Sequence, residues 1–333
     1  IGQRTPGAST SNTLTVTLAA NYDLPDGSTV TISGLMGTQT TDDAELAVTS
    51  SSGRLGTKGA WTQSTGELVL TAASGGMAQG QACIVSFNVT NPVATQSSPA
   101  VSVQAAIEDG SGVTVGSVGQ VAMTKSNSSL FGVPNGGNPL EVLVPALSTK
   151  AIGQRTPGAS TSNTLTVTLT ANYNLADGST VTISGLTGSQ TADAASLAVT
   201  STNGDLGTTG AWTQTAGTLV LTAASGGTTQ GTACEVTLDL TNPAATQTSP
   251  AVSVVAVIRD SSVTVANIAQ VAMTKPDSDL FGVSNGANPL EVLVPAFSAK
   301  GIGQSTPGSG ETNRITVTLT ANYNLADGST VTI

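Results

Sequence analysis

The chain has 333 residues, a formal net charge of −10 and only 10 Lys and Arg residues. With so few cations it cannot neutralise many phosphates, which argues against nucleic acids and anionic membranes as partners. It contains no histidine, so Ser-His-Asp catalysis, His-ligated zinc and an imidazole pH switch are excluded. No apolar run is long enough to cross a bilayer, and we expect no direct membrane insertion of this segment.

An internal repeat is the dominant feature of the sequence. IGQRTPGASTSNTLTVTL begins at Ile1 and again at Ile152, and IGQSTPGSGETNRITVTL begins at Ile302. Self-similarity at a fixed spacing predicts a tandem array, here two complete repeats and the first strands of a third. The predicted boundaries are 1–151, 152–301 and 302–333. Because the third copy stops within the strand-like run TVTI, we expect the chain to be a window from a longer repetitive protein.

Within the first repeat, short runs of alternating apolar and polar residues are separated by turn-forming Pro, Asp, Asn and Gly. The predicted strands, in chain order, are 13–20, 28–33, 45–51, 67–72, 82–90, 100–107, 112–124 and 139–147. No window shows a period of 3.6 residues, and we expect only a short helical turn at 126–130. The pattern predicts an all-β fold of tandem Ig-like or jelly-roll-like antiparallel β-sandwich repeats of about 150 residues each.

Alternation along each strand also assigns side chains to the core or the surface. In the strand 82–90, Cys83, Val85, Phe87 and Val89 form the inward row. Asn88 then lies on the outward row. The linker 144–163, with proline near both ends, is expected to pack between repeats rather than remain loose.

Cysteine and tryptophan each occur once per repeat, as Cys83 and Cys234 and as Trp61 and Trp212. A single cysteine cannot form a disulfide within its repeat, and its inward register favours a buried thiol; cross-links between chains are the alternative. The tryptophans, both in GAWTQ, are predicted core anchors. Stacking on a sugar ring is the alternative, and it requires an exposed indole.

Two N-glycosylation sequons occur in the first repeat, at Asn88-Val-Thr90 and Asn127-Ser-Ser129. Asn88 is on the outward row and Asn127 lies in a polar stretch, so both are candidate acceptors of covalent glycans. In the second repeat Asp239 stands at the position of Asn88, and Asp277 or Asp279 at that of Asn127. Glycans would therefore decorate alternate repeats only.

Scattered carboxylates leave a calcium site at the junctions as a minor alternative, and otherwise no cofactor is expected. The first-repeat group is Asp23, Asp26, Asp42, Asp43 and Glu45. Most of this group is lost in the second repeat. No nucleophile with its base and no matched pair of acids occurs in both repeats, so we predict that the protein is not an enzyme.

Four motifs carry a family resemblance: I-G-Q-R/S-T-P-G, L-T-V-T-L-x-A-N-Y, D-G-S-T-V-T-I-S-G-L and G-A-W-T-Q. With them the whole chain resembles the very large tandem-repeat surface proteins predicted from algal and other protist genomes. In architecture it is also similar to bacterial Ig-like repeat adhesins. The resemblance implies a secreted, multi-copy β-sandwich protein at the cell surface and no catalytic residues.

These observations lead to two functional hypotheses. The first is a structural repeat of an extracellular filament or cell-surface fibre, glycosylated and self-associating through packed or strand-complemented junctions. In its stronger form, strands 315–319 and 329–333 of the third copy complete or pack on the second repeat. The second hypothesis is an adhesin stalk or a carbohydrate-binding surface repeat.

Overall fold

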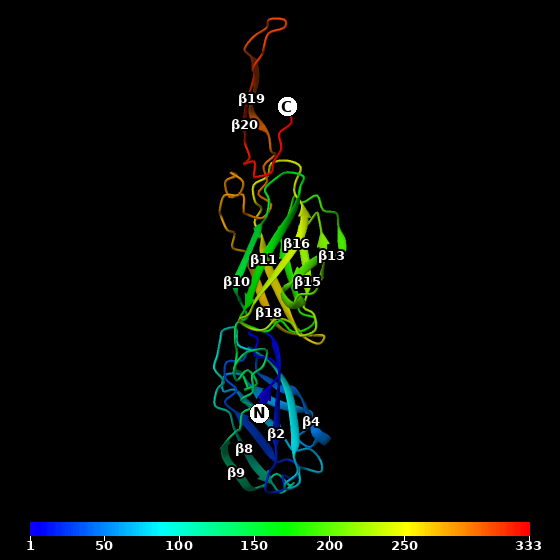
Figure 1. Ribbon diagram of the computed structural model, residues 1–333. Helices are drawn as coiled ribbons and strands as arrows, with labels where there is room; N and C mark the ends of the chain where they lie inside the picture. Colours follow the sequence, from blue (N-terminus) through cyan, green and yellow to red (C-terminus); the bar gives the residue numbers. More distant parts are fainter.

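The structure is a computed structural model that describes residues 1–333, except for the side chain of Ser52. Two antiparallel β-domains, here called the first and second units, follow one another along the long axis of an elongated molecule (Figure 1). A two-stranded hairpin extends beyond the second unit. The predicted all-β sandwich fold is confirmed, because strands and the turns between them account for almost the whole chain.

The two units contain the same nine strands in the same order. In the first unit they are β1 Gly2–Gln3, β2 Ser11–Leu18, β3 Thr29–Ser33, β4 Asp43–Ser50, β5 Lys58–Thr62, β6 Glu67–Thr71, β7 Cys83–Thr90, β8 Ser102–Glu108 and β9 Thr114–Ala122. In the second unit they are β10 Leu147–Gln154, β11 Ser162–Ala171, β12 Thr180–Ser184, β13 Ala194–Ser201, β14 Thr209–Thr213, β15 Thr218–Thr222, β16 Ala233–Thr241, β17 Ser253–Asp260 and β18 Val263–Ala272. The hairpin consists of β19 Phe297–Gln304 and β20 Ile315–Ala321.

One strand in each unit belongs to both layers of the sandwich. The strand order in the first unit is β1-β2-β7-β4-β5-β6-β3-β8-β9. The last residues of β4, from Val48 to Ser50, pair with β7, whereas Asp43, Leu46 and Ala47 pair with β5. A register irregularity between Asp43 and Leu46 bends the strand from one layer into the other. β13 repeats this arrangement in the second unit.

The first seven predicted strands are confirmed, but the eighth is not. Segment 139–147 forms single bridges, Val142 with Gln96 and Leu143 with Gly7, since two prolines interrupt it and Leu140 has a φ of 55°. The sequence analysis missed β5, where an inward glycine beside the tryptophan hides the alternation. The helical turn expected at 126–130 is also wrong. The two short 3₁₀ turns are η1, Ser51–Gly53, and η2, Thr202–Gly204.

The strand that leads into the second unit begins before the repeated motif does. β10 starts at Leu147 and pairs with β11 up to Ala171, so the line between 151 and 152 falls inside a strand. In the same way, the line between 301 and 302 falls inside β19. Residues 147–151, which belong to the first repeat by sequence, are thus part of the sheet of the second unit.

The third copy adds no strand to the sheet of the second unit. β20, which includes residues 315–319, pairs with β19 in a separate sheet. Residues 329–333 form no strand, and Ile333 is 82% exposed. Ile315 and Leu319 are exposed, whereas the matching Leu165 and Leu169 of the second unit are buried by the strands around them.

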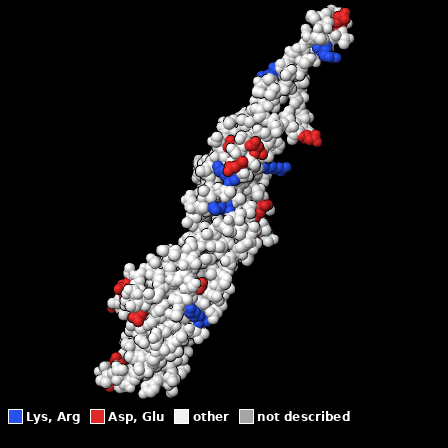
Figure 2. Space-filling view, turned by 90° about the vertical axis from the view of Figure 1, so that its left-hand side faces the viewer, with Lys and Arg blue, Asp and Glu red and all other residues white. Residues whose placement is uncertain are grey.

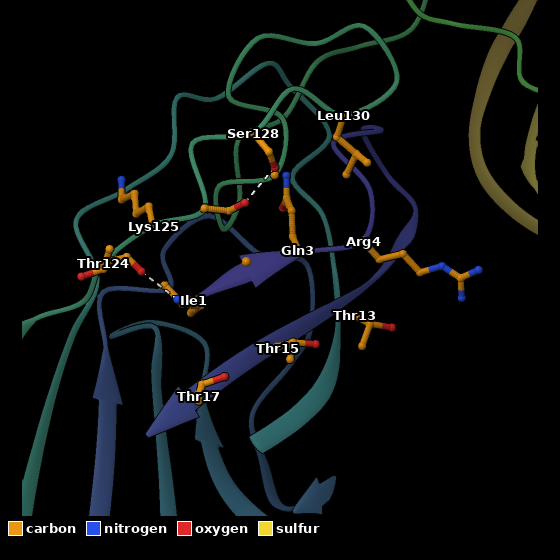
Figure 3. A pocket seen from close by; sticks show the side chains of 13 residues that line it. Ile1, Gln3, Arg4, Thr13, Thr15, Thr17, Thr124, Lys125, Ser128 and Leu130 are labelled. Carbon is orange, nitrogen blue, oxygen red and sulfur yellow. Dashed lines mark hydrogen bonds between the residues drawn. The ribbon is translucent and has the colours of Figure 1, made fainter. Parts of the chain in front are cut away.

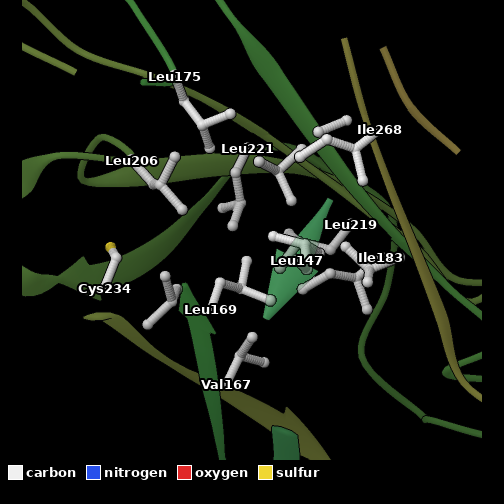
Figure 4. Packing of buried hydrophobic residues seen from close by; sticks show 14 of the residues in the cluster. Leu147, Val167, Leu169, Leu175, Ile183, Leu206, Leu219, Leu221, Cys234 and Ile268 are labelled. Carbon is white, nitrogen blue, oxygen red and sulfur yellow. The ribbon is translucent and has the colours of Figure 1, made fainter. Parts of the chain in front are cut away.

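Each unit has its own apolar core, and the predicted faces are confirmed. The inward row of β7, from Cys83 to Val89, is buried, and Ile84 between them is 50% exposed. Figure 4 shows the corresponding core of the second unit, in which Leu147 from β10 packs among side chains of β11, β12, β15 and β18. Leu147 therefore anchors the connecting strand in the core of the next unit.

Candidate functional site: the junction between units

The two tryptophans lie inside the cores. Trp61 and Trp212 are each 2% exposed. Their Nε1–H groups donate to the carbonyl oxygens of Thr40 and Thr191, both at 3.0 Å. A buried indole whose one polar atom is already bonded presents no face to a sugar ring.

The cysteines occupy equivalent, buried places in the two cores. Both thiols are free, and Cys83 and Cys234 are at most 2% exposed. Burial raises the pKa of the Cys234 thiol, and the nearby Asp205 carboxylate raises it further. A neutral buried thiol reacts slowly, so neither cysteine is placed to cross-link chains.

Both sequon asparagines are exposed, and each also accepts a hydrogen bond within its unit. Thr13 donates to Asn88 Oδ1 at 2.7 Å, and Asn138 Nδ2 donates to Asn127 Oδ1 at 3.0 Å. In the second unit Asp239 and Asp277 accept the same bonds from Thr164 and Asn288. Both units therefore have a side-chain oxygen that accepts a hydrogen bond at each of these two positions. Only the first unit has the amide nitrogen of an asparagine there.

Two of the carboxylates considered as calcium ligands, Asp23 and Asp42, accept hydrogen bonds from backbone N–H groups in loops. Asp23 Oδ1 accepts the Gln79 N–H at 2.7 Å, and Asp42 Oδ1 accepts the Gln63 N–H at 2.7 Å. Glu45 pairs with Lys58 on the surface at 2.8 Å. Among the described side chains, no three or more Asp, Glu, Cys or His groups converge on one point. Nor does any helix in the described chain have the length and apolarity needed to cross a membrane.

A set of specific contacts between residues far apart in the sequence lies where the first unit meets the second. Thr5, in the loop after β1, donates its hydroxyl to the Val265 carbonyl oxygen at 2.6 Å and lies 3.2 Å from the Tyr173 hydroxyl. Thr10 also donates to the Val265 oxygen, at 3.1 Å. Thr5 and Tyr173 are both at most 1% exposed. We call this contact region the junction.

A buried amide network holds the junction loop in place. Asn12 accepts the N–H of Arg4 and of Thr5, and its Nδ2 donates to Gln3 Oε1 and Asn91 Oδ1. Asn91 Nδ2 in turn donates to the carbonyl oxygens of Thr5 and Gly7 at 3.0 and 2.8 Å. Buried and fully hydrogen-bonded amides fix a loop in one conformation. The conformation of the I-G-Q-R-T-P-G loop is thus fixed by hydrogen bonds within the first unit.

Gly7 lies where the two units approach most closely. A Cβ atom at this position would be 2.4 Å from the Val265 oxygen and 2.8 Å from the Ala266 Cβ. Both of those residues are buried in the second unit. Only glycine permits this approach without displacing one of the backbones.

A second loop of the first unit inserts an aromatic ring beside Tyr173. The rings of Phe131 and Tyr173 stack with centroids 5.3 Å apart and planes at 16°. The Asn174 N–H donates to the Phe131 oxygen at 2.9 Å. Val133, from the same loop, belongs to the core cluster of the second unit. The core of the second unit therefore extends across the junction into the first.

The connecting segment is clamped by one asparagine. Asn172 donates from Nδ2 to the Val144 oxygen at 3.0 Å and accepts the Ala146 N–H at 2.7 Å. Its own N–H donates to the Ala146 oxygen at 3.0 Å. Together with Leu147 in the core, these bonds hold the start of the linker against the second unit, so the predicted packing of the linker is seen there.

Part of the junction, namely the aromatic stack, the tyrosine contact and the asparagine clamp, forms again between the second unit and the partial third copy. Phe281 and Tyr323 stack at 5.4 Å and 14°, and Thr156 Oγ1 lies 3.2 Å from the Tyr323 hydroxyl. Asn322 clamps Val294 and Ala296 at 3.1 and 2.7 Å. Although the third copy contributes only a hairpin and its turn, the contacts agree with those of the junction to within about 0.1 Å.

Charge contributes little to the junction. On the face shown in Figure 2, charged side chains are few and much of the surface is uncharged. One ion pair crosses the junction, from Arg4 to Asp260 at 3.1 Å, and its side chains are 41% and 45% exposed. Solvent-exposed pairs of this kind stabilise only weakly. Apolar packing and buried hydrogen bonds therefore dominate the contact.

Burial raises the pKa of the Tyr173 phenol well above its usual range, and the Thr5 hydrogen bond offsets only part of this rise. Because the folded state favours the neutral phenol, stability is present below the ordinary tyrosine pKa of about 10 and falls as the pH rises above it. We expect one of the three tyrosines to ionise late in an absorbance titration at 295 nm. The late step should disappear in Tyr173→Phe; if it remains, Tyr173 is not its source.

A polar groove of about 640 Å³ lies beside β1 and is the largest of the cavities described. Thr13, Thr15 and Thr17 follow one another along β2 on one side of it, and Thr124 and Ser128 lie across from them (Figure 3). It is lined mainly by hydroxyl and backbone groups, without an aromatic ring or a carboxylate. This lining offers neither a stacking face nor an acid–base pair.

No protein-family model matches the chain, and no curated protein matches it. Among solved structures it is similar to a serine-rich repeat protein, Srr2, from Streptococcus agalactiae, with 9% identity and a TM-score of 0.20 over 78% of this chain and 84% of that one. It is also similar to the collagen binding domain of the Erysipelothrix rhusiopathiae surface protein RspB, with 12% identity and a TM-score of 0.22 over 81% and 86%. Both are bacterial, so an algal or protist origin finds no support here. Likeness at these TM-scores transfers no function.

Proposed function

We propose that this protein is a structural repeat of an extracellular filament or cell-surface fibre, in which rigid junctions set the orientation of successive units. The observation that carries the proposal is the recurrence of one junction within one chain, as Phe131 on Tyr173 and as Phe281 on Tyr323. Units that repeat one contact at one geometry generate a regular axial array. A rigid array of such units also suits a role in adhesion or display at a cell surface.

The junction is built to resist bending. It joins a strand anchored in the next core at Leu147, a stacked aromatic pair and the buried hydrogen bonds of Thr5. Bending at the junction would have to break one or more of these contacts. A flexible string of beads would instead have an exposed linker with few contacts.

Electron imaging of the chain, with two-dimensional averaging, tests the proposal. We expect straight particles in which the two units hold one relative orientation. The matched variant is Phe131→Ala, which removes the ring that stacks on Tyr173 and packs against the edge of the second core. It should broaden the distribution of angles between units. Wild-type particles that already bend freely would refute the proposal.

Fibre and stalk differ in how rods meet. A fibre-forming repeat joins rods axially or laterally, whereas an adhesin stalk remains a single string. The alternative of a carbohydrate-binding repeat depended on exposed tryptophans, and both indoles are buried. Regular axial or lateral order in images of concentrated protein therefore favours the fibre.

Glycosylation belongs to the same proposal. Asn88 is exposed on β7, and its sequon threonine, Thr90, lies at the end of the same strand. We expect expression through a eukaryotic secretory pathway to add an N-linked glycan that enzymatic deglycosylation removes, with the matching loss of mass. Asn88→Gln and Asn127→Gln, made singly, assign it. An unmodified mass for the secreted wild-type chain would contradict this part of the proposal.

A further inference from the structure

Each unit is closed by bonds between the segment through which the chain enters it and the segment through which the chain leaves. In the second unit we call residues 154–159, at the end of β10 and after it, the entry segment, and residues 286–293 the exit segment. The two form a parallel bridge, in which the Leu293 N–H donates to the Pro157 oxygen at 2.8 Å and the Ala159 N–H donates to the Leu293 oxygen at 3.1 Å. Entry and exit therefore run side by side in the same direction.

The glutamine of the entry segment ties the two segments together a second time. Gln154 Nε2 donates to the carbonyl oxygens of Gly286 and Glu291, both at 2.8 Å. Its Oε1 accepts the Leu290 N–H at 2.8 Å, and its backbone N–H donates to the Ala287 oxygen at 3.0 Å. These bonds of Gln154, together with the parallel bridge, are here called the clasp.

The first unit contains the same clasp. Gln3 Nε2 donates to the oxygens of Gly136 and Glu141 at 2.8 and 2.7 Å. The Leu143 N–H donates to the Pro6 oxygen at 2.8 Å, within the matching parallel bridge. In both units the glutamine and the proline come from I-G-Q-R-T-P-G. The repeated motif therefore encodes the entry side of the clasp.

The exit segment is also held by the rest of the second unit. Gln247 and Val292 exchange two backbone hydrogen bonds, at 2.8 and 2.9 Å. The Ser249 N–H donates to the Glu291 carboxylate at 2.7 Å. Leu290 and Val292 are at most 1% exposed. A load on the exit segment is therefore passed to the folded unit and not to a loose loop.

The parallel direction of the bridge decides how tension along the chain acts on it. The chain enters the second unit at one end and leaves it at the other, and β10 and β11 run roughly along the axis between them (Figure 1). Tension pulls the entry segment back toward Leu147 and the exit segment forward toward Val294. Since the two segments are parallel, these pulls slide them past one another. The bonds of the clasp are thus loaded in shear and break together, whereas the bonds of a hairpin pulled open from its free ends break one at a time.

We propose that the clasp bears tension, so that each unit resists being pulled lengthwise through shear of these bonds before its core is opened. The inference goes beyond the proposed function, because a fibre and a stalk would both carry load along the chain. The load reaches the clasp through β10, which pairs with β11 from Leu147 to Gln154. The same strand that orients successive units therefore transmits force between them.

Single-molecule force spectroscopy at constant load, with the full chain held by its two ends, measures how fast each unit unfolds. We expect two steps, one per unit, each lengthening the chain by up to about 480 Å, the reach of the residues between Gln154 and Leu293. Gln154→Ala removes the side-chain bonds of one clasp. It should raise the rate of one step about tenfold or more and leave the other unchanged. Two unchanged rates would overturn the proposal.

A core variant separates resistance to tension from general stability. Leu219 in β15 is fully buried, and β15 pairs with neither segment of the clasp. Leu219→Ala should lower the midpoint of denaturant unfolding more than Gln154→Ala does, because it leaves a cavity in the core. Under load the order should reverse, with Gln154→Ala accelerating unfolding more. If Leu219→Ala is the faster of the two under load as well, the core and not the clasp resists tension.

A second pulling direction tests the geometry itself. A handle at Asn203, in the exposed turn η2, and a second handle at the C-terminal end apply force to the second unit without loading its entry segment. The second unit should then unfold faster at the same load, and Gln154→Ala should change that rate by about twofold at most. Equal rates in the two directions, or equal acceleration by Gln154→Ala in both, would overturn the proposal. Straight particles in electron images would still support the proposed function in that case, so the two can fail separately.

Discussion

Gly7→Val opens the junction while both units remain folded. Its Cβ would lie 2.4 Å from the Val265 oxygen and 2.8 Å from the Ala266 Cβ, and both of these residues are buried in β18. Overpacking of this kind costs about 1–3 kcal/mol. Gly7 has no positive φ, so valine strains only the contact and not its own loop. The valine therefore destabilises the contact between the two units and not the fold of either unit.

Small-angle X-ray scattering checks this expectation, since separated units give a broader distribution of distances and a more flexible profile. The matched control is Gly158→Val in the second unit. There the nearest atoms to a Cβ are side-chain atoms of Thr161 and Thr156 at 3.4 and 3.5 Å, which is ordinary contact. Gly158→Val should scatter like the wild type. If both variants or neither change the profile, Gly7 does not control the junction.

Trp61→Ala should cause the largest loss of stability of any single substitution considered, and this loss should be confined mainly to the first unit. Trp61 is among the largest fully buried side chains, and truncation of such a residue to alanine costs about 3–5 kcal/mol. It also leaves the Thr40 carbonyl oxygen without the indole donor. The second unit keeps Trp212 in its own core, which provides a reporter within the same chain.

Denaturant unfolding measures the effect. In the Trp61→Ala chain, circular dichroism should show a transition at lower denaturant concentration, while Trp212 fluorescence should report a second, later one. Trp61→Phe retains an aromatic ring in the core and loses the hydrogen bond, for which we expect the smaller cost of about 1–3 kcal/mol. A single unchanged transition in Trp61→Ala would show that Trp61 does not anchor the first core.

The local sequence pattern predicted the structure correctly where the two-residue period of a strand alone assigns side chains to the core or the surface. Alternation placed Cys83, Val85, Phe87 and Val89 in the core and Asn88 outside, because successive side chains of a strand point to opposite faces. It failed in β5, where Gly59 takes an inward position without an apolar side chain to mark it. It also failed at 139–147, where proline removes the N–H groups that a ladder requires.

The junction was visible in the sequence only as repetition. I-G-Q-R/S-T-P-G occurs three times, yet nothing in these letters says that Thr5 reaches Val265, 260 positions away along the chain. The threefold recurrence of Asn-Tyr, at Tyr22, Tyr173 and Tyr323, was the available signal, but as part of L-T-V-T-L-x-A-N-Y it indicated only a family resemblance and not a contact. Contacts between units depend on how two folded surfaces fit together, and the alternation of residues within one strand carries no information about that fit.

By itself, the sequence determined an all-β array of near-identical units, the inward rows of their strands and the exclusion of histidine chemistry, because these follow from composition, period and repetition. Only the tertiary structure decided that β10 crosses into the next unit and that Phe131 stacks on Tyr173. Each of these depends on long-range packing between residues that are far apart in the chain. Such packing is set by the shape and burial of folded surfaces rather than by neighbouring residues.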